Sequence, residues 1–424
     1  MRLAATVAKA ISPGVEDVVT SGLCVGCGLC ASQFGPRHIE MSATRDGFER
    51  PRVIEPLSPD QERDFRQICP GIHVEGPIRE ALPSEDAVWG PILDMAEFHA
   101  ADPGLRFAGA SSGSLSTLAL HLIESGEVDF VAHLVMSATE PLKSQVQVSQ
   151  TRDDIDAATG SRYAPTVLLQ NLHELLDRDR PFAIVGKPCD ITALTNLASI
   201  DPRVDRLVRY RLSFFCGGVS PLTMPRAFLE RQGVDEAELA SFRWRGMGCP
   251  GPTTAVTRDG RAESSSYLDY WGDDEESWGI AFRCKICPDS IASRADIALG
   301  DAWHGGNPSG ETDGVSMLVA RTSRGRALVQ SAVSAGLLVR GRELTREDLE
   351  DYQPHHAVRR RAAAARQVGL FLASGMRIRT RRLRLLPAAR GASLASSIQM
   401  VRGAVRRARA GREGMPVQQA DQAL

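Results

Sequence analysis

The sequence is poor in lysine and contains no long apolar run. Only four of its 50 basic side chains are lysines, so arginine carries almost all of the positive charge. A membrane-spanning helix needs about 18 consecutive apolar residues, and no run approaches that length. The N-terminal segment MRLAATVAKAI becomes polar too soon for a signal peptide. We therefore expect a protein that stays in the cytoplasm.

Acidic residues are absent from a long basic segment near the C-terminus. Residues 353–412 contain fifteen Arg and no Asp or Glu, although the net formal charge of the whole chain is −2. That net charge argues against a molecule built to bind nucleic acid, and the single aromatic residue of this basic segment, Phe371, offers little for base stacking. We predict a solvated, partly helical extension with a disordered end at 414–424. Contact of residues 381–386 with a membrane surface is a weaker alternative.

Eight of the nine cysteines fall into two sets of four. C-x-x-C spacing without an export signal favours a reducing compartment and metal ligation over disulfides. The first set lies in SGLCVGCGLC and ICPG and comprises Cys24, Cys27, Cys30 and Cys69. Three thiolates within seven residues can each reach a different iron of a 4Fe–4S cluster, and the Cys-Pro pair resembles the end of the ferredoxin signature. A zinc site is the alternative, but zinc modules usually separate two C-x-x-C pairs by a longer loop.

The second set is spread along the chain and comprises Cys189, Cys216, Cys284 and Cys287. Its first two members each follow a predicted strand, and loops at strand ends converge in space. They can therefore meet the C-x-x-C pair and form a second cluster site. The alternative is two buried structural cysteines and a reactive dithiol. Cys249 remains without a partner, and we expect it to be structural.

Helix-type and strand-type patterns alternate in the middle of the chain. The strongest predict helices at 115–126 and 167–178, and strands at 128–137, 182–186, 207–218, 295–303 and 315–322. This alternation is typical of an α/β domain with a helix-covered mixed sheet, with α+β as the alternative class. We place this domain at 104–350. A small ferredoxin-like module at 1–75 and a linker at 76–103 precede it, and the basic extension at 351–424 follows it.

The segments around the later cysteines resemble a known family. KPCDITAL, FFCGG and RCKICPDSIASRADIALGDAW, with the Gly/Ser-rich start of the helix at 115, are similar to the coenzyme F420 hydrogenase/dehydrogenase beta-subunit family, which includes hydroxymethyl-chlorophyll reductases. The resemblance covers residues 20–345. It implies FAD in the α/β domain beside a 4Fe–4S cluster held by the second set. It also implies a further cluster where a C-x-x-C-x-x-C module is added.

Seven residues are candidates for the flavin site. Small residues at a helix start let a phosphate approach free backbone N–H groups, as at Ser111, Ser112, Gly113 and Ser114. A plain capping motif is the alternative. The segment GSRY at 160–163 resembles a family segment, which implies Arg162 as a partner of a pyrophosphate and Tyr163 as a neighbour of the ring. The resemblance places Lys187 between flavin and cluster, where a cation stabilises reduced flavin.

For other polar residues the functional hypotheses are weaker. Arg243 and Arg245 lie in SFRWRGMGCPG and suit an anionic substrate, with an exposed basic hairpin as the alternative. Asp301 and His304 follow a predicted strand end, where proton chemistry is common, but we expect His304 to be structural or to position a ring. The sequence leaves the catalytic residues unknown.

We therefore expect an iron–sulfur flavoprotein oxidoreductase with FAD and two 4Fe–4S clusters. It would pass electrons between an organic substrate or hydride donor, such as coenzyme F420, and ferredoxin or a redox partner subunit. A closely related hypothesis is an electron-transfer subunit whose catalysis needs a partner chain. The alternative from another class is a non-catalytic, zinc-binding interaction protein that docks to a surface through its basic tail.

Overall fold

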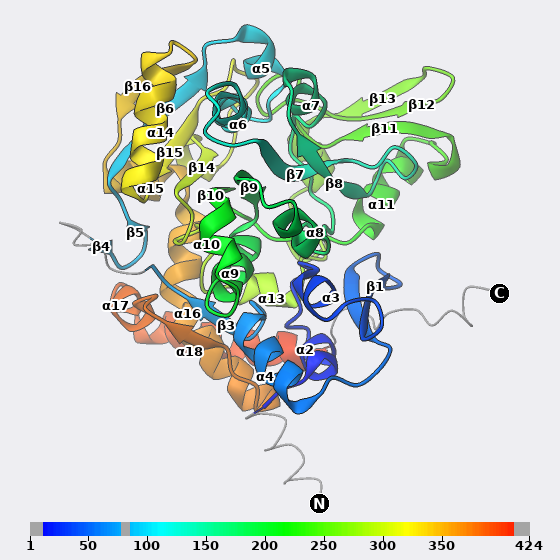
Figure 1. Cartoon of the computed structure of the whole chain (residues 1–424), viewed down its shortest axis with the longest axis vertical. Coiled ribbons are helices and arrows are strands. Elements are labelled where there is room, and N and C mark those ends of the chain that lie inside the picture. Colours follow the sequence, from blue (N-terminus) through cyan, green and yellow to red (C-terminus); the bar gives the residue numbers. More distant parts are fainter. Residues whose placement is uncertain (1–11, 78–84, 411–424) are drawn as a thin grey trace, which may run out of the picture.

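The centre of the molecule is an eight-stranded mixed sheet. The computed structural model describes residues 12–77 and 85–410 (Figure 1), so the predicted disordered end at 414–424 lies outside the described residues. The strand order is β16 (Leu338–Glu343), β6 (Asp94–Ala100), β15 (Ser316–Ala320), β14 (Ile297–Asp301), β10 (Val208–Phe214), β9 (Phe182–Gly186), β7 (Phe130–Met136) and β8 (Ser144–Ser149). The four strands β14, β10, β9 and β7 run parallel to one another, and the flanking pairs are antiparallel.

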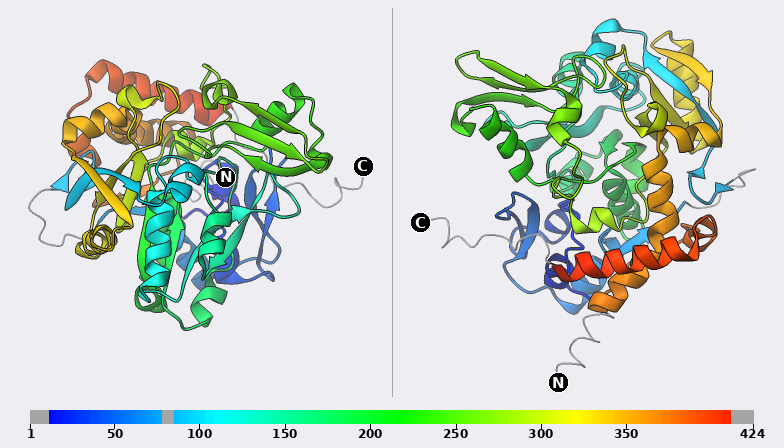
Figure 2. Two further views of the ribbon diagram at one scale, coloured as in Figure 1. Left: turned by 90° about the horizontal axis from the view of Figure 1, so that it is seen from above. Right: turned by 180° about the vertical axis from the view of Figure 1, so that it is seen from behind.

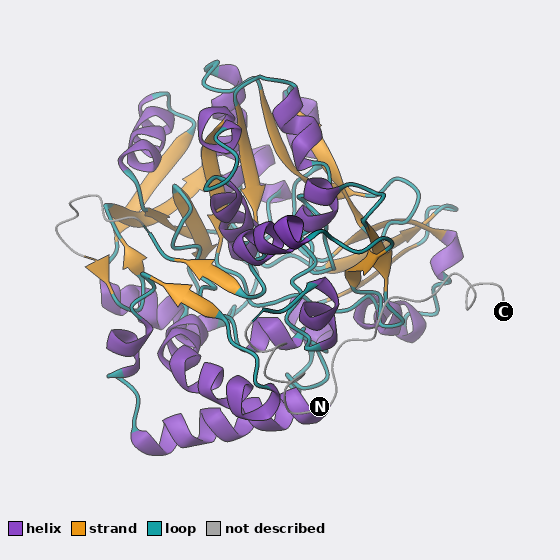
Figure 3. Cartoon of the chain, turned by 60° about the horizontal axis from the view of Figure 1, so that its bottom comes forward, coloured by secondary structure: helices purple, strands orange, loops and turns teal. Residues whose placement is uncertain are grey.

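Both faces of this sheet are buried, because apolar residues alternate between them along the strands. In β9, Phe182 and Ile184 join one core cluster and Ala183 joins another. The first face is covered by α8 (Leu172–Asp177), α9 (Pro188–Leu197) and α10 (Arg203–Leu207), and the second by α6 (Ser114–Glu124) and α14 (Ser323–Ser334). Figure 3 shows helices on both sides of the strands. The helix-covered mixed sheet predicted from the sequence is thus confirmed.

Two predicted boundaries in this domain are wrong. Residues 94–100 were expected in a linker, but they form β6, which pairs with β15 and β16. Ala96, Phe98 and Ala100 point into the core between polar neighbours, and this short alternation is obscured by the Pro, Asp and Glu around it. The predicted helix at 167–178 begins only at Leu172. The short strands β4 (Glu85–Asp86) and β5 (Gly90–Pro91) pair with each other ahead of β6.

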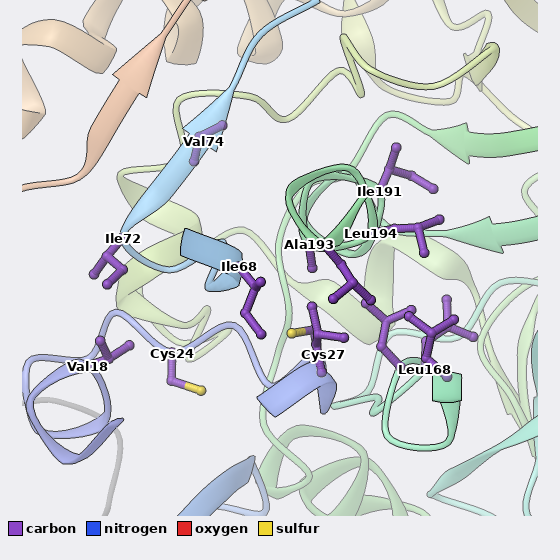
Figure 4. Packing of buried hydrophobic residues seen from close by; sticks show 14 of the residues in the cluster. Val18, Cys24, Cys27, Ile68, Ile72, Val74, Leu168, Ile191, Ala193 and Leu194 are labelled. Atoms are coloured by element: carbon purple, nitrogen blue, oxygen red, sulfur yellow. The ribbon is translucent and has the colours of Figure 1, made fainter. Parts of the chain in front are cut away.

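The N-terminal segment contains short elements that share the core of the large sheet. They are α2 (Val15–Thr20), α3 (Leu29–Phe34), β1 (Ile39–Ala43), β2 (Glu49–Val53), α4 (Pro59–Ile68) and β3 (His73–Glu75). Val18, Leu23 and Ile68 belong to the same buried cluster as Ile191 and Leu194 of α9. Figure 4 shows Val18 beside Cys24, and Ile68 between Cys24 and Cys27. The segment therefore packs onto α8 and α9, the helices that cover this face of the sheet.

The C-terminal segment is folded onto the same end of the molecule (Figures 1 and 2). It contains α15 (Arg346–Tyr352), α16 (Pro354–Ser374), β17 (Arg379–Arg381), α17 (Leu385–Ala389) and α18 (Leu394–Ala410). Strand β17 pairs in parallel with β3, and α16 packs on α18. A Cβ at Gly369 would lie 2.6 Å from the carbonyl oxygen of Val401, so glycine is required at this helix contact.

The prediction of a solvated basic extension is wrong for residues 354–410. The buried face of α16 is made of small residues, including Ala357, Ala362 and Ala363, whose pattern gives little hydrophobic signal. Several arginines of this segment donate hydrogen bonds to the core, and others pair with acids elsewhere in the chain, as Arg382 does with Glu75 at 3.1 Å. Among the described residues, no helix is long and apolar enough to cross a membrane.

A smaller layer flanks the sheet at the β8 end. It contains the antiparallel sheet of β11 (Leu239–Arg243), β12 (Thr253–Thr257) and β13 (Ala262–Ser265), with α11 (Thr223–Arg231) and α12 (Tyr267–Trp271). Its core is aromatic and centres on Phe228, Phe242 and Trp244. The remaining helices are α5 (Pro103–Ala108), α7 (Arg152–Ala157) and α13 (Phe282–Lys285), with 3-10 turns η1 (Glu236–Glu238) and η2 (His304–Gly306).

Candidate functional site

The first cysteine set lines one small cavity. Its wall contains all four thiols with Val15, Val18, Met41, Phe65 and Ile68. Figure 4 shows the sulfur atoms of Cys24 and Cys27 pointing toward one another near Ile68. Cys30 lies in the first turn of α3, and Cys69 is the C-cap residue of α4. These two helix ends therefore add the third and fourth thiols to the two that the loop carries.

Two glycines let the loop of the first set fold back on itself. Gly26 has φ +70° and Gly28 has φ +84°, in the left-handed region that side chains disfavour. A Cβ at Gly26 would lie 2.8 Å from the carbonyl oxygen of Glu49, and a Cβ at Gly28 would lie 2.8 Å from the backbone nitrogen of Gln170. The backbone N–H of Gly26 also donates to the Cys24 sulfur at 3.4 Å. Glycine is thus needed at both positions for the thiols to converge.

Burial disfavours the thiolate form and raises the pKa of three thiols of the first set. It raises the pKa of Cys69 to about 12, and the charge of Cys24 acts in the same direction. Burial also raises the pKa of Cys27 and Cys30 well above the usual range, and each responds to the other cysteines of the set. Four thiolates this close, in an apolar wall, are stable only with cations between them.

The second cysteine set assembles from three distant segments. Cys189 is in the first turn of α9, Cys216 follows β10, and Cys284 lies in α13. The backbone N–H of Cys216 donates to the carbonyl of Ser290 at 2.9 Å, three residues beyond Cys287. Burial raises the pKa of Cys216 to about 12, with Cys284 and Cys287 adding to the rise, and Cys189 responds to Cys216 and Cys284. These mutual effects place Cys189 and Cys216 within electrostatic reach of the C-x-x-C pair, while the role of the four thiols as ligands stays a prediction.

The spacing of the thiols differs from that of a single-ion site. In residues 12–77 and 85–410, no three His, Cys, Asp or Glu side chains lie close enough together to hold one metal ion. A tetrahedral zinc ion gathers its sulfur ligands at about 2.3 Å from one centre. A 4Fe–4S cluster presents each thiolate to a different iron and keeps the sulfur atoms farther apart. Which of the two groups the thiols hold stays a prediction.

A buried ion pair lies between the two cysteine sets. Lys187 Nζ donates to Asp190 Oδ2 at 2.9 Å and to Thr166 Oγ1 at 2.5 Å. Burial alone lowers the pKa of Lys187, but Asp190, Cys189 and Cys216 outweigh it and raise that pKa. Asp190 is fully buried and also acts on the pKa of Cys27 in the first set. Sequence reasoning named Lys187 but missed Asp190, although Lys-x-x-Asp at a helix start is a capping pattern.

A second missed residue, Arg283, connects the two sets directly. Its guanidinium is 3% exposed and donates from Nε to the carbonyl of Gly71 at 3.0 Å and from Nη2 to the carbonyl of Pro70 at 2.9 Å. Arg283 precedes Cys284, and Pro70 follows Cys69. One buried cation therefore joins a loop of the first set to a helix of the second. An arginine beside a C-x-x-C pair was the only sequence signal for this link.

The serines at the start of α6 are bonded within the protein. Ser112 donates to the Ser316 hydroxyl at 2.7 Å and shares a 2.7 Å hydrogen bond with Ser114, and Ser111 donates to the carbonyl of Val315 at 3.2 Å. Gly113 has φ +69° and caps the helix, and a Cβ there would lie 2.4 Å from the carbonyl oxygen of Leu105. A phosphate at this helix start would therefore meet backbone N–H groups first.

Arg162 and Tyr163 lie in the aromatic layer beside the sheet. Arg162 donates to the Ser144 hydroxyl at 2.6 Å and to the carbonyls of Pro141 and Lys143, and its guanidinium lies 4.8 Å from the Trp244 ring centroid. These contacts hold the β7–β8 hairpin, a structural role that competes with the predicted pyrophosphate contact. Burial, with the charge of Arg243, lowers the pKa of Arg162 to about 10.

Arg245 is a buried arginine of this layer that forms an ion pair. It makes two 3.0 Å hydrogen bonds to the carboxylate of Asp301, and its guanidinium lies 4.6 Å from the Trp303 ring centroid and 5.1 Å from that of Tyr267. Burial alone lowers its pKa, but Asp301 outweighs this and raises it. It also donates to the Tyr163 hydroxyl at 3.2 Å. The alternative of an exposed basic hairpin is therefore wrong for Arg245.

The other polar candidates have structural surroundings. Arg243 donates to the carbonyls of Ala108 and Thr159, both at 3.3 Å. His304 is exposed and pairs with Asp351 at 2.6 Å. Cys249 is 2% exposed, in keeping with the structural role expected for it.

Two family models match most of the sheet and the second cysteine set. The N-terminal part of the coenzyme F420 hydrogenase/dehydrogenase beta subunit matches residues 95–173, and its C-terminal part matches residues 179–342. Together they cover more than half of the chain. This chain belongs to the coenzyme F420 hydrogenase/dehydrogenase beta-subunit family. The match begins with β6 and ends in β16, so both the first cysteine set and the C-terminal helices lie outside it.

Curated relatives and a solved structure agree with this assignment. The chain is 25% identical over 248 residues to the F420-dependent formate dehydrogenase 1 subunit beta of Methanococcus maripaludis, covering 57% of this chain and 60% of that relative. It is 23% identical over 251 residues to the coenzyme F420 hydrogenase subunit beta of Methanococcus voltae, covering 56% of this chain and 80% of that relative. The chain thus spans about 60% of the length of the formate dehydrogenase subunits that it matches.

A chain of the F420-reducing [NiFe] hydrogenase complex from Methanosarcina barkeri has the same fold. The TM-score is 0.51 at 18% identity, with 70% of this chain and 98% of that chain covered. At this identity the likeness shows the fold, and the chemistry has to be argued from the residues.

Proposed function

We propose that this protein is an iron–sulfur flavoprotein oxidoreductase that holds two 4Fe–4S clusters and FAD. The observation that carries the proposal is the grouping of eight buried or half-buried cysteines into two sets of four, joined by Arg283 and separated by the Lys187–Asp190 pair. Two such groups, one next to the other, are suited to passing single electrons.

The residues present fit the proposed clusters. Cys24, Cys27, Cys30 and Cys69 would hold the outer cluster, and the second set would hold the inner one. The C-x-x-C-x-x-C spacing of the first set supports a cluster over zinc. The glycine turns bring N–H groups toward the sulfur atoms of the first set, which raises the reduction potential of a bound cluster.

The residues of the α6 start and the aromatic layer are proposed to hold FAD. A bound flavin accepts or donates an electron pair as hydride and exchanges single electrons with a cluster. The N–H groups that follow Gly113 suit a phosphate, and Ser111, Ser112 and Ser114 shape the loop around it. Lys187 is cationic beside the second set and would stabilise negative charge on a reduced ring.

The substrate and partner are proposed from the relatives. Two of them are named as F420-dependent formate dehydrogenase and F420 hydrogenase beta subunits, which supports coenzyme F420 as hydride donor or acceptor and a redox partner subunit. Ferredoxin is the alternative partner. We propose that the cluster of the first set faces this partner, because it lies on the side of the inner set away from the family-matched flavin region.

The composition of the purified protein tests the cofactors. Anaerobic purification should yield about eight irons and eight sulfides per chain, together with one FAD and no zinc. Cys284→Ser should lower iron by about half, since four of eight irons belong to the inner set. Cys249→Ser is the matched control and should leave iron unchanged. Zinc without sulfide, or unchanged iron in Cys284→Ser, would contradict the proposal.

An activity assay separates an independent enzyme from a subunit. The purified chain would be mixed with reduced coenzyme F420 and an electron-accepting dye. Dye reduction by the chain alone indicates that its own flavin completes the reaction. Reduction only after a partner chain is added indicates an electron-transfer subunit.

A further inference from the structure

Helix α16 lies outside the family-matched region but contacts the second cysteine set. Arg359 donates from Nη1 to the carbonyl of Cys216 at 3.0 Å and from Nη2 to the carbonyl of Gly217 at 2.8 Å. The two terminal nitrogens of one planar guanidinium thus hold two peptide groups that follow β10. Such a two-point contact fixes the loop more firmly than a single hydrogen bond does.

A second arginine of the same helix holds the C-x-x-C segment. Arg366 donates from Nη1 to the carbonyl of Lys285 at 2.9 Å, and Lys285 lies between Cys284 and Cys287. Between these two arginines, Arg360 is 4% exposed and donates to the carbonyl of Pro288 at 2.5 Å. The residues at and after Cys216 and those between and after Cys284 and Cys287 are therefore all hydrogen-bonded to α16.

The start of the helix adds a fourth contact. His356 is buried, and its Nδ1 is 2.8 Å from the hydroxyl of Ser290. The carbonyl of Ser290 in turn accepts from the Cys216 N–H at 2.9 Å. Residues three, four and seven positions apart share one face of a helix, which explains why His356, Arg359, Arg360 and Arg366 all reach the same site.

These arginines also bring positive charge to the thiols. Arg359 is bonded to the carbonyl of Cys216 and Arg366 to that of Lys285, so two guanidinium groups lie beside the backbone of the second set. Burial and the charges of Arg359 and Arg407 lower the pKa of Arg366 only to about 10, so it is cationic at neutral pH. By contrast, the wall of the cavity around the first set contains no charged residue.

We propose that α16 is a clamp on the redox site, in which Arg359 and Arg366 are positioning residues for the second cysteine set. They hold the loops of Cys216 and Cys284–Cys287 in place, and their charges favour the reduced, more negative state of the group that the thiolates bind. The proposal deepens the proposed function, since it assumes that this group carries electrons. It assigns the basic C-terminal segment a role inside the molecule.

Two substitutions of Arg359 distinguish the effect of its hydrogen bonds to the loop from the effect of its charge. Arg359→Lys keeps the positive charge but loses the two-point contact, and Arg359→Gln loses both. Arg402→Gln removes an exposed arginine of α18 and is the matched control. The midpoint potential of each cluster would be followed by EPR during redox titration. We expect Arg359→Gln to shift the inner cluster to a more negative potential and to leave the outer one unchanged, with Arg359→Lys and Arg402→Gln close to wild type.

Thiol labelling of the metal-free chain supplies a second measurement. Both Arg359 variants should alkylate several-fold faster at Cys216, while Cys24 reacts at the wild-type rate in every variant. Equal potentials and equal labelling rates in wild type and Arg359→Gln would overturn the clamp.

The two proposals fail in different ways. A wild-type chain that binds no iron would refute the proposed function, and in that case the clamp as an electron-tuning device falls too. Two intact clusters with an unchanged inner potential in Arg359→Gln would leave the proposed function standing and refute the charge role of α16.

Discussion

The two cysteine sets reach similar groupings by different means. Three thiols of the first set lie within seven residues, in a loop that Gly26 and Gly28 allow to fold back, and the cavity wall around them is apolar. The second set joins segments almost one hundred residues apart, and arginines from a C-terminal helix hold them. One site depends on local backbone geometry and the other on tertiary contacts, so they should respond differently to substitution.

The largest effect is expected at the ion pair between the sets. Lys187→Met leaves the fully buried Asp190 carboxylate without its cation, which should lower the free energy of unfolding by about 3–5 kcal/mol. Chemical denaturation measures this loss. Because Asp190 acts on cysteines of both sets, iron should fall in both.

The double variant Lys187→Met/Asp190→Leu is the control, because removing both charges should recover much of the lost stability. No recovery would mean that Lys187 contributes mainly through contacts other than Asp190.

A glycine substitution should damage the first set alone. Gly28→Ala places a side chain at φ +84° and against the backbone of Gln170, which should cost about 1–3 kcal/mol in strain alone. Iron should fall by about half, with the EPR signal of the inner cluster retained.

Gly35→Ala separates strain from overlap. Gly35 also has a positive φ, +76°, but nothing lies within 4 Å of its added Cβ. It should lose stability without losing iron. Equal iron loss in both variants would show that local backbone strain, and not the shape of the cysteine loop, governs the first set.

The smallest effect is expected at the link between the sets. Arg283→Lys keeps the cation but replaces the two nitrogens that serve the carbonyls of Gly71 and Pro70 with a single one. One buried carbonyl should therefore lose a well-placed donor, at a cost of about 1–2 kcal/mol. The iron content should stay at the wild-type value. Magnetic coupling between the two reduced clusters should weaken in the EPR spectrum, and an unchanged spectrum would argue against Arg283 as a link.

Much of the sheet was predictable because its strands carry strong local signals. The strands at 182–186 and 207–218 are short apolar segments that end at turn residues, and β9 and β10 lie within them. The prediction failed where burial uses small or charged residues. Helix α16 buries alanines and arginines, and β6 is only seven residues long among acidic neighbours.

The most predictable parts of the site were those formed by residues close together in the sequence. The C-x-x-C-x-x-C motif indicates its own convergence, and the strand-end argument anticipated the approach of Cys189 and Cys216 to the C-x-x-C pair. The contacts of Asp190, Arg283 and Arg359 were not predictable, since each acts on residues that lie far away in the sequence or on backbone carbonyls that carry no sequence signal.

The amino-acid sequence by itself determined the two sets of thiols, the glycine turns of the first set and the alternating helices and strands of the sheet, because each depends on spacing or on local backbone preference. The tertiary structure decided which charges surround each set and where the basic C-terminal segment lies. A guanidinium is as compatible with solvent as with a buried carbonyl, and only the packing of α16 against the sheet determines which of the two it meets.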